Sequence, residues 1–427
     1  MKELIKKMWR LNRAIVSTGF NTALDCIKQE IDLKILSFET GKEFDTWKIP
    51  RKWELDEAYL IDMDTGKKLL DTHDNILHVV IGSLPFDSEI EKEKLARHLH
   101  YDKKRPEFIP CVYKYYDNLD WGFCCTKAQY DKVMKSQRLK AVIKTAYSDG
   151  ELKLGEFTVK GKSPDTIYIL SHLDGPGQAN DSLSGAAVSV ELVKRLSNIQ
   201  TYYTYKFLYL PGTIGPMVYL HSNPDVVKNG VAAIILEMLG NNSTLTLQHS
   251  LHKDEYIDRV LHYILSREGK PFKERDFGKI IYNGERIFNA PGIDIPTVSL
   301  SRLESGDLPF HEYRTSGDSP DIIDESRLKE AVDVVLKTIN ILENDFVPVR
   351  KYFGIPFLSK YGLWVEWSQY PELRVQINNI LFLLNNNNSV FEIARELNLD
   401  YKEVYEFINK MAENKLVDKR QVFISEN

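Results

Sequence analysis

A short stretch of this chain places one histidine and two aspartates where they could share a metal ion. An apolar run at 167–171 leads into His172, Asp174 follows, and Asp181 lies nine positions after the histidine, with glycine and proline between. An imidazole and a carboxylate presented by one turn are common ligands of a divalent ion such as zinc. Asp174 is placed to hold the ring of His172, as outer carboxylates do for metal-binding histidines. The alternative is a surface turn with no ligand role.

The longer string around these residues resembles the first metal-binding motif of the zinc aminopeptidases and carboxypeptidases of peptidase family M-twenty-eight. That motif is a His-x-Asp followed by Asn-Asp-x-x-Ser-Gly, and this chain matches it at 172–174 and again at 180–185. The resemblance implies an α/β fold: a mixed-sheet, zinc-peptidase-like core with helices on both faces. It also implies that His172 and Asp181 bind metal.

Three later strand ends complete the family pattern, and two of them lack the family's metal ligand in this chain. After the apolar run at 205–210 the family carries two glutamates, a general base and a metal ligand, but this chain has Gly212 and no carboxylate. The run at 231–236 ends in Glu237, where the family has an aspartate ligand. In the last motif Arg314 stands where the family places a metal-binding histidine.

Both departures concern the same ion of the two-metal family. His172, Asp181 and Glu237 match the ligands of the other ion, so the resemblance implies one divalent metal, zinc, as cofactor. Arg314 would then occupy the place of the second cation, because a guanidinium stays charged and presents a planar fork to a carboxylate. Asp174 and Arg314 are therefore the candidate catalytic residues.

Three further residues are weaker candidates. His311 precedes Arg314 by three positions and is a candidate fourth metal ligand, although loop histidines are often simply exposed. Arg286 and Arg302 are candidates for binding a substrate carboxylate. A salt bridge to a nearby acid would explain each arginine equally well.

Alternating strands and helices are expected to position these side chains. Apolar strands are predicted at 166–171, 205–210, 231–236 and 295–300, and helices at 185–197, 254–267 and 326–342. This alternation is typical of an α/β sheet, in which ligands bind beyond the carboxyl ends of the strands. We expect an aminopeptidase-like domain at 1–45 and 122–350, with a small β-rich inserted domain at 46–121.

The C-terminal region, 351–427, resembles a winged helix-turn-helix. Several strings spread along the chain, including 211–215 and 312–316, also resemble a group of bacterial proteins that combine an aminopeptidase-like domain with such a C-terminal module. The region 351–427 has nine Lys or Arg and ten Asp or Glu, so its formal charge is -1. Because phosphate contacts need a basic surface, a protein partner or homo-oligomer contact is favoured here over nucleic acid.

Composition describes a globular protein without membrane segments. The 427 residues are 43% hydrophobic with a net charge of -5, and no window approaches the roughly 18 apolar residues of a membrane span. The N-terminus lacks the apolar stretch of a signal peptide, and the four cysteines show no disulfide or zinc-ribbon spacing, so we expect a cytoplasmic protein. The sequence favours a metal-dependent hydrolase of a peptide or other amide. The alternatives are an inactive binding or regulatory protein of the same fold and, third, a DNA-binding regulator.

Overall fold

The computed structural model describes residues 1–114, 120–280, 283–304, 306, 308–363, 371–422 and 424. The chain forms two compact units. The first comprises Met1–Lys253 and Pro271–Val332, and the second comprises Asp254–Lys270 and Asp333–Asn427.

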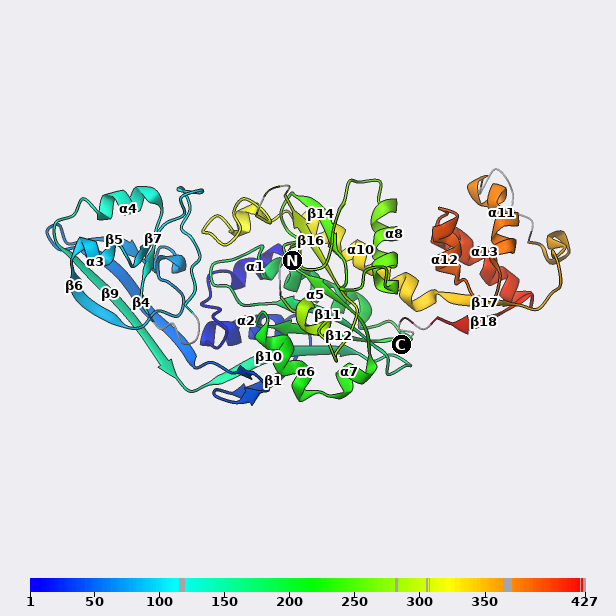
Figure 1. Ribbon diagram of the computed structural model, residues 1–427, viewed down its shortest axis with the longest axis horizontal. Coiled ribbons are helices and arrows are strands. Elements are labelled where there is room, and N and C mark those ends of the chain that lie inside the picture. The colour runs from blue at the N-terminus through cyan, green and yellow to red at the C-terminus, as the bar shows by residue number, and fades with distance from the viewer. Residues whose placement is uncertain are drawn as a thin grey trace. The chain divides into compact units, whose positions relative to one another are not determined.

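An eight-stranded mixed sheet is the centre of the first unit (Figure 1). Its order is β1-β10-β12-β11-β13-β16-β14-β15, and the four middle strands, β12, β11, β13 and β16, are parallel. The strands are β1 (Lys34–Glu39), β10 (Glu151–Val159), β11 (Thr166–His172), β12 (Thr204–Leu210), β13 (Gly230–Leu236), β14 (Thr244–Gln248), β15 (Lys273–Arg275) and β16 (Thr297–Leu303). The predicted mixed α/β core is confirmed. Strands β11 and β13 are buried except at one end residue each, and both have continuous apolar runs, at 167–170 and 231–236, as strands covered on both faces require.

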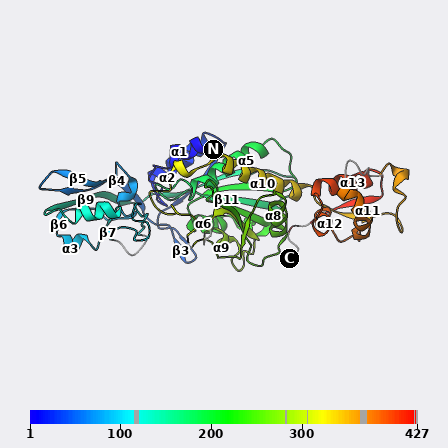
Figure 2. The ribbon, with the colours of Figure 1, turned by 90° about the horizontal axis from the view of Figure 1, so that it is seen from above.

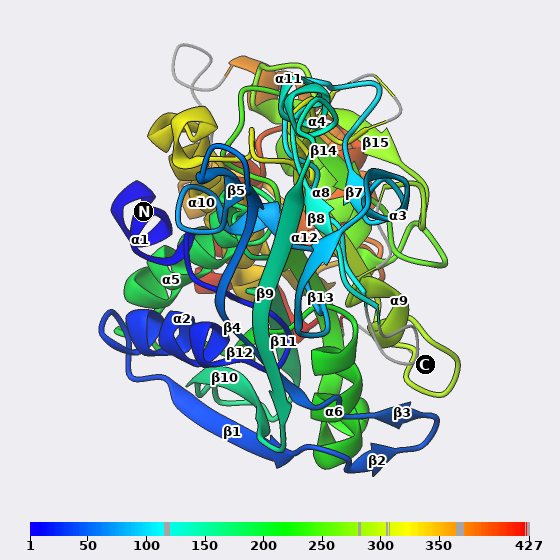
Figure 3. The same ribbon diagram turned by 90° about the vertical axis from the view of Figure 1, so that its left-hand side faces the viewer.

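Helices lie on both sides of this sheet (Figure 3). On one side are α1 (Lys2–Met8), α2 (Thr18–Lys28) and α5 (Leu183–Leu196), and on the other are α6 (Ile214–Ser222) and α9 (Glu285–Phe288). Alternate residues of β11 show the two-residue period of a strand, since Tyr168 and Leu170 pack in one core cluster with residues of α6 and α9. The short α7 (Asp225–Asn229) connects α6 to β13.

A four-stranded antiparallel sheet, ordered β5-β4-β9-β6, forms the β-rich part of the first unit. It contains β4 (Lys52–Asp62), β5 (Lys67–Asp71), β6 (Phe86–Ile90) and β9 (Leu139–Ser148). Around it lie α3 (Lys92–Leu95), α4 (Lys127–Val133) and the strand pair β7 (Leu99–His100) with β8 (Phe123–Cys124). Another strand pair, β2 (Glu43–Phe44) with β3 (Trp47–Lys48), lies beside α6 of the main sheet (Figure 3), and Phe44 packs in the core cluster there. The four-stranded sheet takes one strand, β9, from beyond residue 121, where the sequence led us to end the insertion.

The second unit is helical with one small sheet (Figure 2). It contains α8 (Tyr256–Arg267), the C-terminal part of α10 (Glu325–Asn344), α11 (Pro371–Leu383), α12 (Val390–Glu396) and α13 (Tyr401–Glu413). Its two strands, β17 (Phe346–Arg350) and β18 (Val417–Gln421), pair antiparallel. This order is compatible with a winged helix, which stays a prediction. In the described parts of both units, no helix has the length and apolar character needed to cross a membrane.

Candidate functional site

Three neighbouring parallel strands deliver the candidate residues to one edge of the main sheet. His172 is the last residue of β11, Glu237 follows β13, and Gly212 follows β12 two residues after Leu210. Strand β11 lies between β12 and β13, so the turns after all three strands meet. This is the edge at which open α/β sheets bind ligands.

The loop before α5 brings Asp181 to the same place. The Asn180 side-chain oxygen accepts the Gly240 N–H at 2.8 Å, and the Ser184 hydroxyl accepts the Leu239 N–H at 2.9 Å. A Cβ added at Gly185 would lie 1.8 Å from the carbonyl oxygen of Leu236, so only glycine lets α5 begin against the end of β13. The Asn-Asp-x-x-Ser-Gly string thus ties the Asp181 loop to the strand that carries Glu237.

Asp318 fixes this loop from the opposite side, a role that the sequence did not reveal. Its buried carboxylate accepts the backbone N–H groups of Ala179, Asn180 and Asp181 at 3.2, 2.6 and 2.9 Å. Burial raises the pKa of Asp318 to about 7, against the opposing effect of these hydrogen bonds.

Arg13 holds the turn between His172 and Asp181. Its fully buried guanidinium donates to the carbonyl oxygens of Leu173 at 2.7 Å and Gln178 at 2.8 Å, and also to that of Gly175. Further bonds go to Met8 and Trp9 at the end of α1. Burial lowers the pKa of Arg13 to about 10, which leaves the guanidinium charged at neutral pH. No sequence signal identified Arg13, because its acceptors are backbone atoms and three of the five lie about 160 positions away.

The His172 ring is surrounded by three carboxylates. Nδ1 lies 3.4 Å from Oδ1 of Asp174, while Nε2 lies 3.6 Å from Oδ1 of Asp181 and 3.4 Å from Oε2 of Glu237. Asp174 also accepts the Gly212 N–H at 2.6 Å, which holds it beside the ring. The buried Nε2 atom has no hydrogen-bond partner among the described residues, although two acids are near it.

The electrostatics of the cluster call for a cation. Burial by itself would lower the pKa of His172, but Asp174 and Glu237 raise that pKa well above its usual value. Burial raises the pKa of Asp181, and the opposing effects of His172 and Arg314 do not offset it. With a neutral imidazole, the three carboxylates face two guanidinium groups, those of Arg13 and Arg314, so a proton on His172 or a bound cation balances the remaining negative charge.

Two spacings in the cluster are those expected of zinc ligands. Two ligands of one tetrahedral zinc lie about 3.3 Å apart when each bond is about 2.0 Å long. The two spacings from Nε2, 3.4 and 3.6 Å, are close to this value and long for hydrogen bonds. As the side chains stand, no group of three or more His, Cys, Asp or Glu residues in the described ranges could hold a metal ion. Metal binding is therefore a proposal rather than an observed property.

Arg314 and Gly212 lie on either side of this cluster. The Arg314 Nε is 3.9 Å from Oδ2 of Asp181, and the side chain is 53% exposed, so an incoming molecule can reach it. A Cβ added at Gly212 would lie 3.2 Å from Oδ1 of Asp174 and 3.7 Å from Oδ1 of Asn283. Any side chain at 212 would therefore start inside the site, and glycine leaves that space open.

Several backbone turns at the site have conformations that L-residues rarely adopt. Ser182, Thr213, Met238 and Arg314 have φ values of 98°, 55°, 52° and 52°. Each is one of the predicted site residues or lies directly after Asp181, Gly212 or Glu237. Such conformations cost about 1–3 kcal/mol each and are concentrated at functional sites.

Asn283 links Glu237 to a second, buried acid, Glu285. The Asn283 amide donates to Oε2 of Glu237 at 2.8 Å, and the Asn283 N–H donates to Oε1 of Glu285 at 3.0 Å. Burial and the neighbouring Glu237 raise the pKa of Glu285 to about 8, so this carboxyl is mostly protonated at neutral pH. Asn283 and Glu285 were not among the sequence candidates, because a short helix after a loop carries no metal-site pattern.

The structure does not bring the three weaker candidates to the cluster. His311 is 54% exposed, and its Nε2 lies 3.3 Å from Glu107. Arg302 is 2% exposed and donates to Glu330 and to three backbone carbonyl groups, so its guanidinium is fully used inside the protein. Arg286 is exposed on α9 and makes no ion pair within the described ranges. The salt-bridge alternative explains Arg302, and exposure explains His311.

Comparisons with known proteins agree with this architecture. The family model of the domain of unknown function DUF4910 matches residues 2–345. The chain belongs to this family. A Clostridium acetobutylicum protein, whose name refers to polysaccharide biosynthesis and to an aminopeptidase-like domain, is 28% identical over 409 residues, which are 94% of this chain and 92% of that protein.

Two solved structures extend the comparison of this DUF4910 protein. A crystal structure described as a candidate peptidase from Clostridium acetobutylicum matches with a TM-score of 0.89 and 26% identity, over 98% of this chain and 95% of that one. The zinc aminopeptidase BSAP of Bacillus subtilis matches with a TM-score of 0.58 and 15% identity, over 80% of this chain and 93% of that one. The aminopeptidase-like resemblance is thus confirmed for the fold, and the winged helix stays a prediction.

Proposed function

We propose that this DUF4910 protein is a metal-dependent hydrolase of a peptide or other amide bond, with one zinc or similar divalent ion. The ligands we assign are His172, Asp181 and Glu237. The observation that carries the proposal is the buried Nε2 of His172, which has no hydrogen-bond partner among the described residues and lies at ligand spacing from two carboxylates. The zinc aminopeptidase fold of its structural relative supports the reaction class.

The residues of the chain have separate roles in this proposal. Asp174 accepts from Nδ1 of His172 and so directs Nε2 toward the ion. A bound zinc ion would supply Lewis acidity and a water molecule with a pKa near about 7. Arg314, half exposed beside Asp181, binds a substrate carboxylate or the negative charge that develops on the attacked carbonyl oxygen.

The rival function is a binding or regulatory protein that keeps the fold without the reaction. Gly212 favours this rival, because the family glutamates are missing there and no described carboxylate replaces them at that turn. If the protein is a hydrolase, the proton for the leaving amine must therefore come from a group outside the cluster.

Metal content and amide hydrolysis on the same preparations distinguish these functions. We expect about one zinc per chain after supplementation and dialysis, close to zero in His172→Ala, and no change in the control His252→Ala, an exposed histidine outside the cluster. Aminoacyl anilide hydrolysis that is lost in His172→Ala supports the enzyme. Stoichiometric zinc without hydrolysis supports the rival, and wild-type protein that retains no zinc refutes the metal site.

A further inference from the structure

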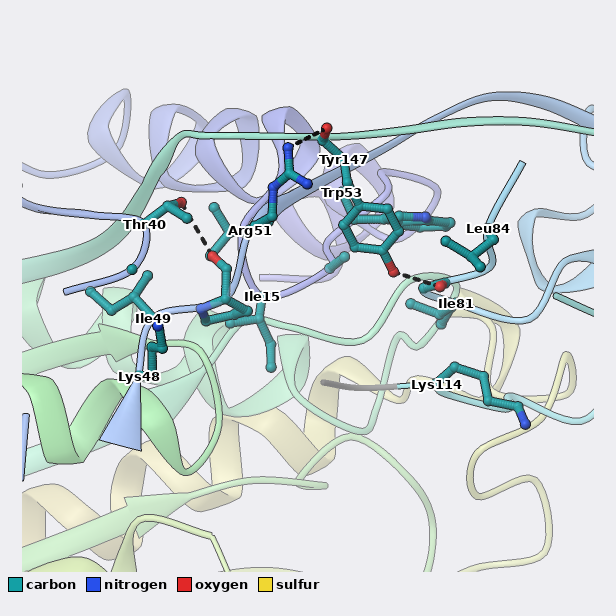
Figure 4. Close-up of a pocket in the computed structure, with 15 residues that line it drawn as sticks. Ile15, Thr40, Lys48, Ile49, Arg51, Trp53, Ile81, Leu84, Lys114 and Tyr147 are labelled. Atoms are coloured by element: carbon teal, nitrogen blue, oxygen red, sulfur yellow. Dashed lines mark hydrogen bonds between the residues drawn. The ribbon is translucent and has the colours of Figure 1, made fainter. Parts of the chain in front are cut away.

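The first unit contains a cavity that shares no residue with the His172 cluster (Figure 4). Its volume is about 420 Å³, within the range of small-molecule sites. The wall is formed by the segment after Arg13, the β2–β3 hairpin region, and strands of the β-rich sheet. Nothing in the proposed hydrolase uses this cavity.

The interior of the cavity is apolar and aromatic. Figure 4 shows the rings of Trp53 and Tyr147 close together, with Ile15 and Ile49 also lining the cavity. The polar atoms of both rings are already bonded, because Trp53 Nε1 donates to the Ser83 carbonyl at 3.0 Å and the Tyr147 hydroxyl donates to that of Gly82 at 2.5 Å. The rings therefore offer apolar surface to an occupant, and a flat ring system suits them.

Among the residues that the structure describes, the charged side chains that line the cavity are all basic: Lys48, Arg51 and Lys114. Each has a distant acidic neighbour, since Lys48 lies 3.5 Å from Glu43, Arg51 3.8 Å from Asp149, and Lys114 3.6 Å from Asp120. Those acids are 68%, 93% and 42% exposed. Exposed pairs at such distances are weak, so Lys48 and Lys114 remain available to an anion at the rim. Arg51 also donates to the Tyr147 carbonyl oxygen at 3.0 Å and offers only its other N–H groups.

We propose that this cavity binds a small organic anion, which has a flat aromatic body and one carboxylate, phosphate or sulfonate group. The body packs against Trp53 and Tyr147, and the anionic group faces the rim cations. The match of an apolar interior with an exclusively basic rim separates this ligand from a neutral lipid, which would gain nothing from the rim, and from an inorganic anion, which would gain nothing from the rings.

A matched pair of fluorescent probes tests the proposal on the full chain. Anilinonaphthalene sulfonate carries the proposed anion, and N-phenylnaphthylamine is the same ring system without charge. Both are titrated into wild-type protein, into a variant with Lys48, Arg51 and Lys114 replaced by Gln, and into a control of equal net charge. The control replaces Lys28, Lys160 and Lys228, three exposed lysines that do not line the cavity, by Gln.

We expect saturable binding of one sulfonate per chain that weakens about tenfold in the cavity variant and less than about twofold in the control. Binding of the uncharged probe should change less than about twofold in either variant. Leu84→Trp, which narrows the cavity from a half-buried position, should weaken both probes. Equal sulfonate affinity in the cavity and control variants, or binding that never saturates, overturns the proposal.

Discussion

Replacing Arg13 by methionine tests whether the metal-ligand turn is held by a single buried guanidinium. Arg13 is 0% exposed and donates to five carbonyl oxygens, three of them in the turn after His172. Methionine keeps much of the volume but none of the donors. Arg10→Met is the matched control, because Arg10 is exposed and its guanidinium only lies over the ring of Trp9 at 5.1 Å.

The magnitude follows from two opposed contributions. Hydrogen bonds to a charged group contribute about 1.5–3 kcal/mol each, so five would sum to about 7–15 kcal/mol. Methionine avoids the cost of burying a guanidinium, which is several kcal/mol, and some of the freed carbonyl groups regain water. We therefore expect Arg13→Met to lower the free energy of unfolding by about 4 kcal/mol, near the upper end for single substitutions, and Arg10→Met by about 0.5 kcal/mol or less.

Urea unfolding and hydrogen exchange measure the two parts of this prediction. The free energy comes from the transition followed by tryptophan fluorescence. Exchange measured on the peptide that spans 173–182 should rise in Arg13→Met under native conditions, because the turn loses its anchor while the sheet remains. Zinc affinity should fall with it. A loss of less than about 1 kcal/mol relative to Arg10→Met, with exchange in the turn unchanged, would refute the assignment of Arg13 as the anchor.

Three further predictions concern the site and the second unit. The double variant Gly212→Glu with Arg314→His should raise bound zinc from about one to about two ions per chain by elemental analysis, and unchanged stoichiometry would contradict the argument that these positions replace a second ion. Asn283→Ala should weaken zinc binding about tenfold in chelator competition, because Glu237 loses its 2.8 Å hydrogen bond, and equal affinity would remove Asn283 from the site. Burial raises the pKa of Asp345 to about 6, so the native state holds an extra proton and its stability should fall by about 3 kcal/mol as pH rises from about 4 to 6. Asp345→Asn should remove that slope in unfolding measured against pH, and a slope that persists would assign it to another group.

The sequence could predict the cluster because its members follow two adjacent parallel strands, β11 and β13. Apolar runs at 166–171 and 231–236 are clear strand patterns, and adjacent parallel strands must bring the residues after them to one edge. The position of Asp181 followed from the motif, whose Ser184 and Gly185 turn out to dock the loop on β13. The residue types of the motif therefore predicted where the loop lies in the fold.

Other features left no mark in the sequence. Arg13 donates hydrogen bonds to backbone carbonyl groups. Because every residue has such a group, no particular residue type in the sequence indicates a partner for Arg13. The sequence left Arg302 open between substrate binding and a salt bridge, because its partner Glu330 lies on the next helix along the chain and no local pattern pairs the two residues. Strand β9 belongs to the small sheet although it follows the expected boundary at 121, because alternation identifies a strand but not the sheet it joins.

The two departures from the aminopeptidase pattern are related through charge. Among the ligands of the missing ion, the chain loses the negative charge of a glutamate at Gly212 and gains the positive charge of Arg314 at a histidine position. Counted over these two ligand positions alone, the changes add two positive charges, which is the charge of the divalent ion they replace. The missing general-base glutamate adds a third. Either change alone would leave the neighbouring carboxylates, Asp174 and Asp181, under- or overcompensated in a buried place. We therefore expect Arg314→His alone to lower the free energy of unfolding more than the double variant does. Only the double variant restores both the ligands of a second ion and the negative charge that such an ion would neutralise.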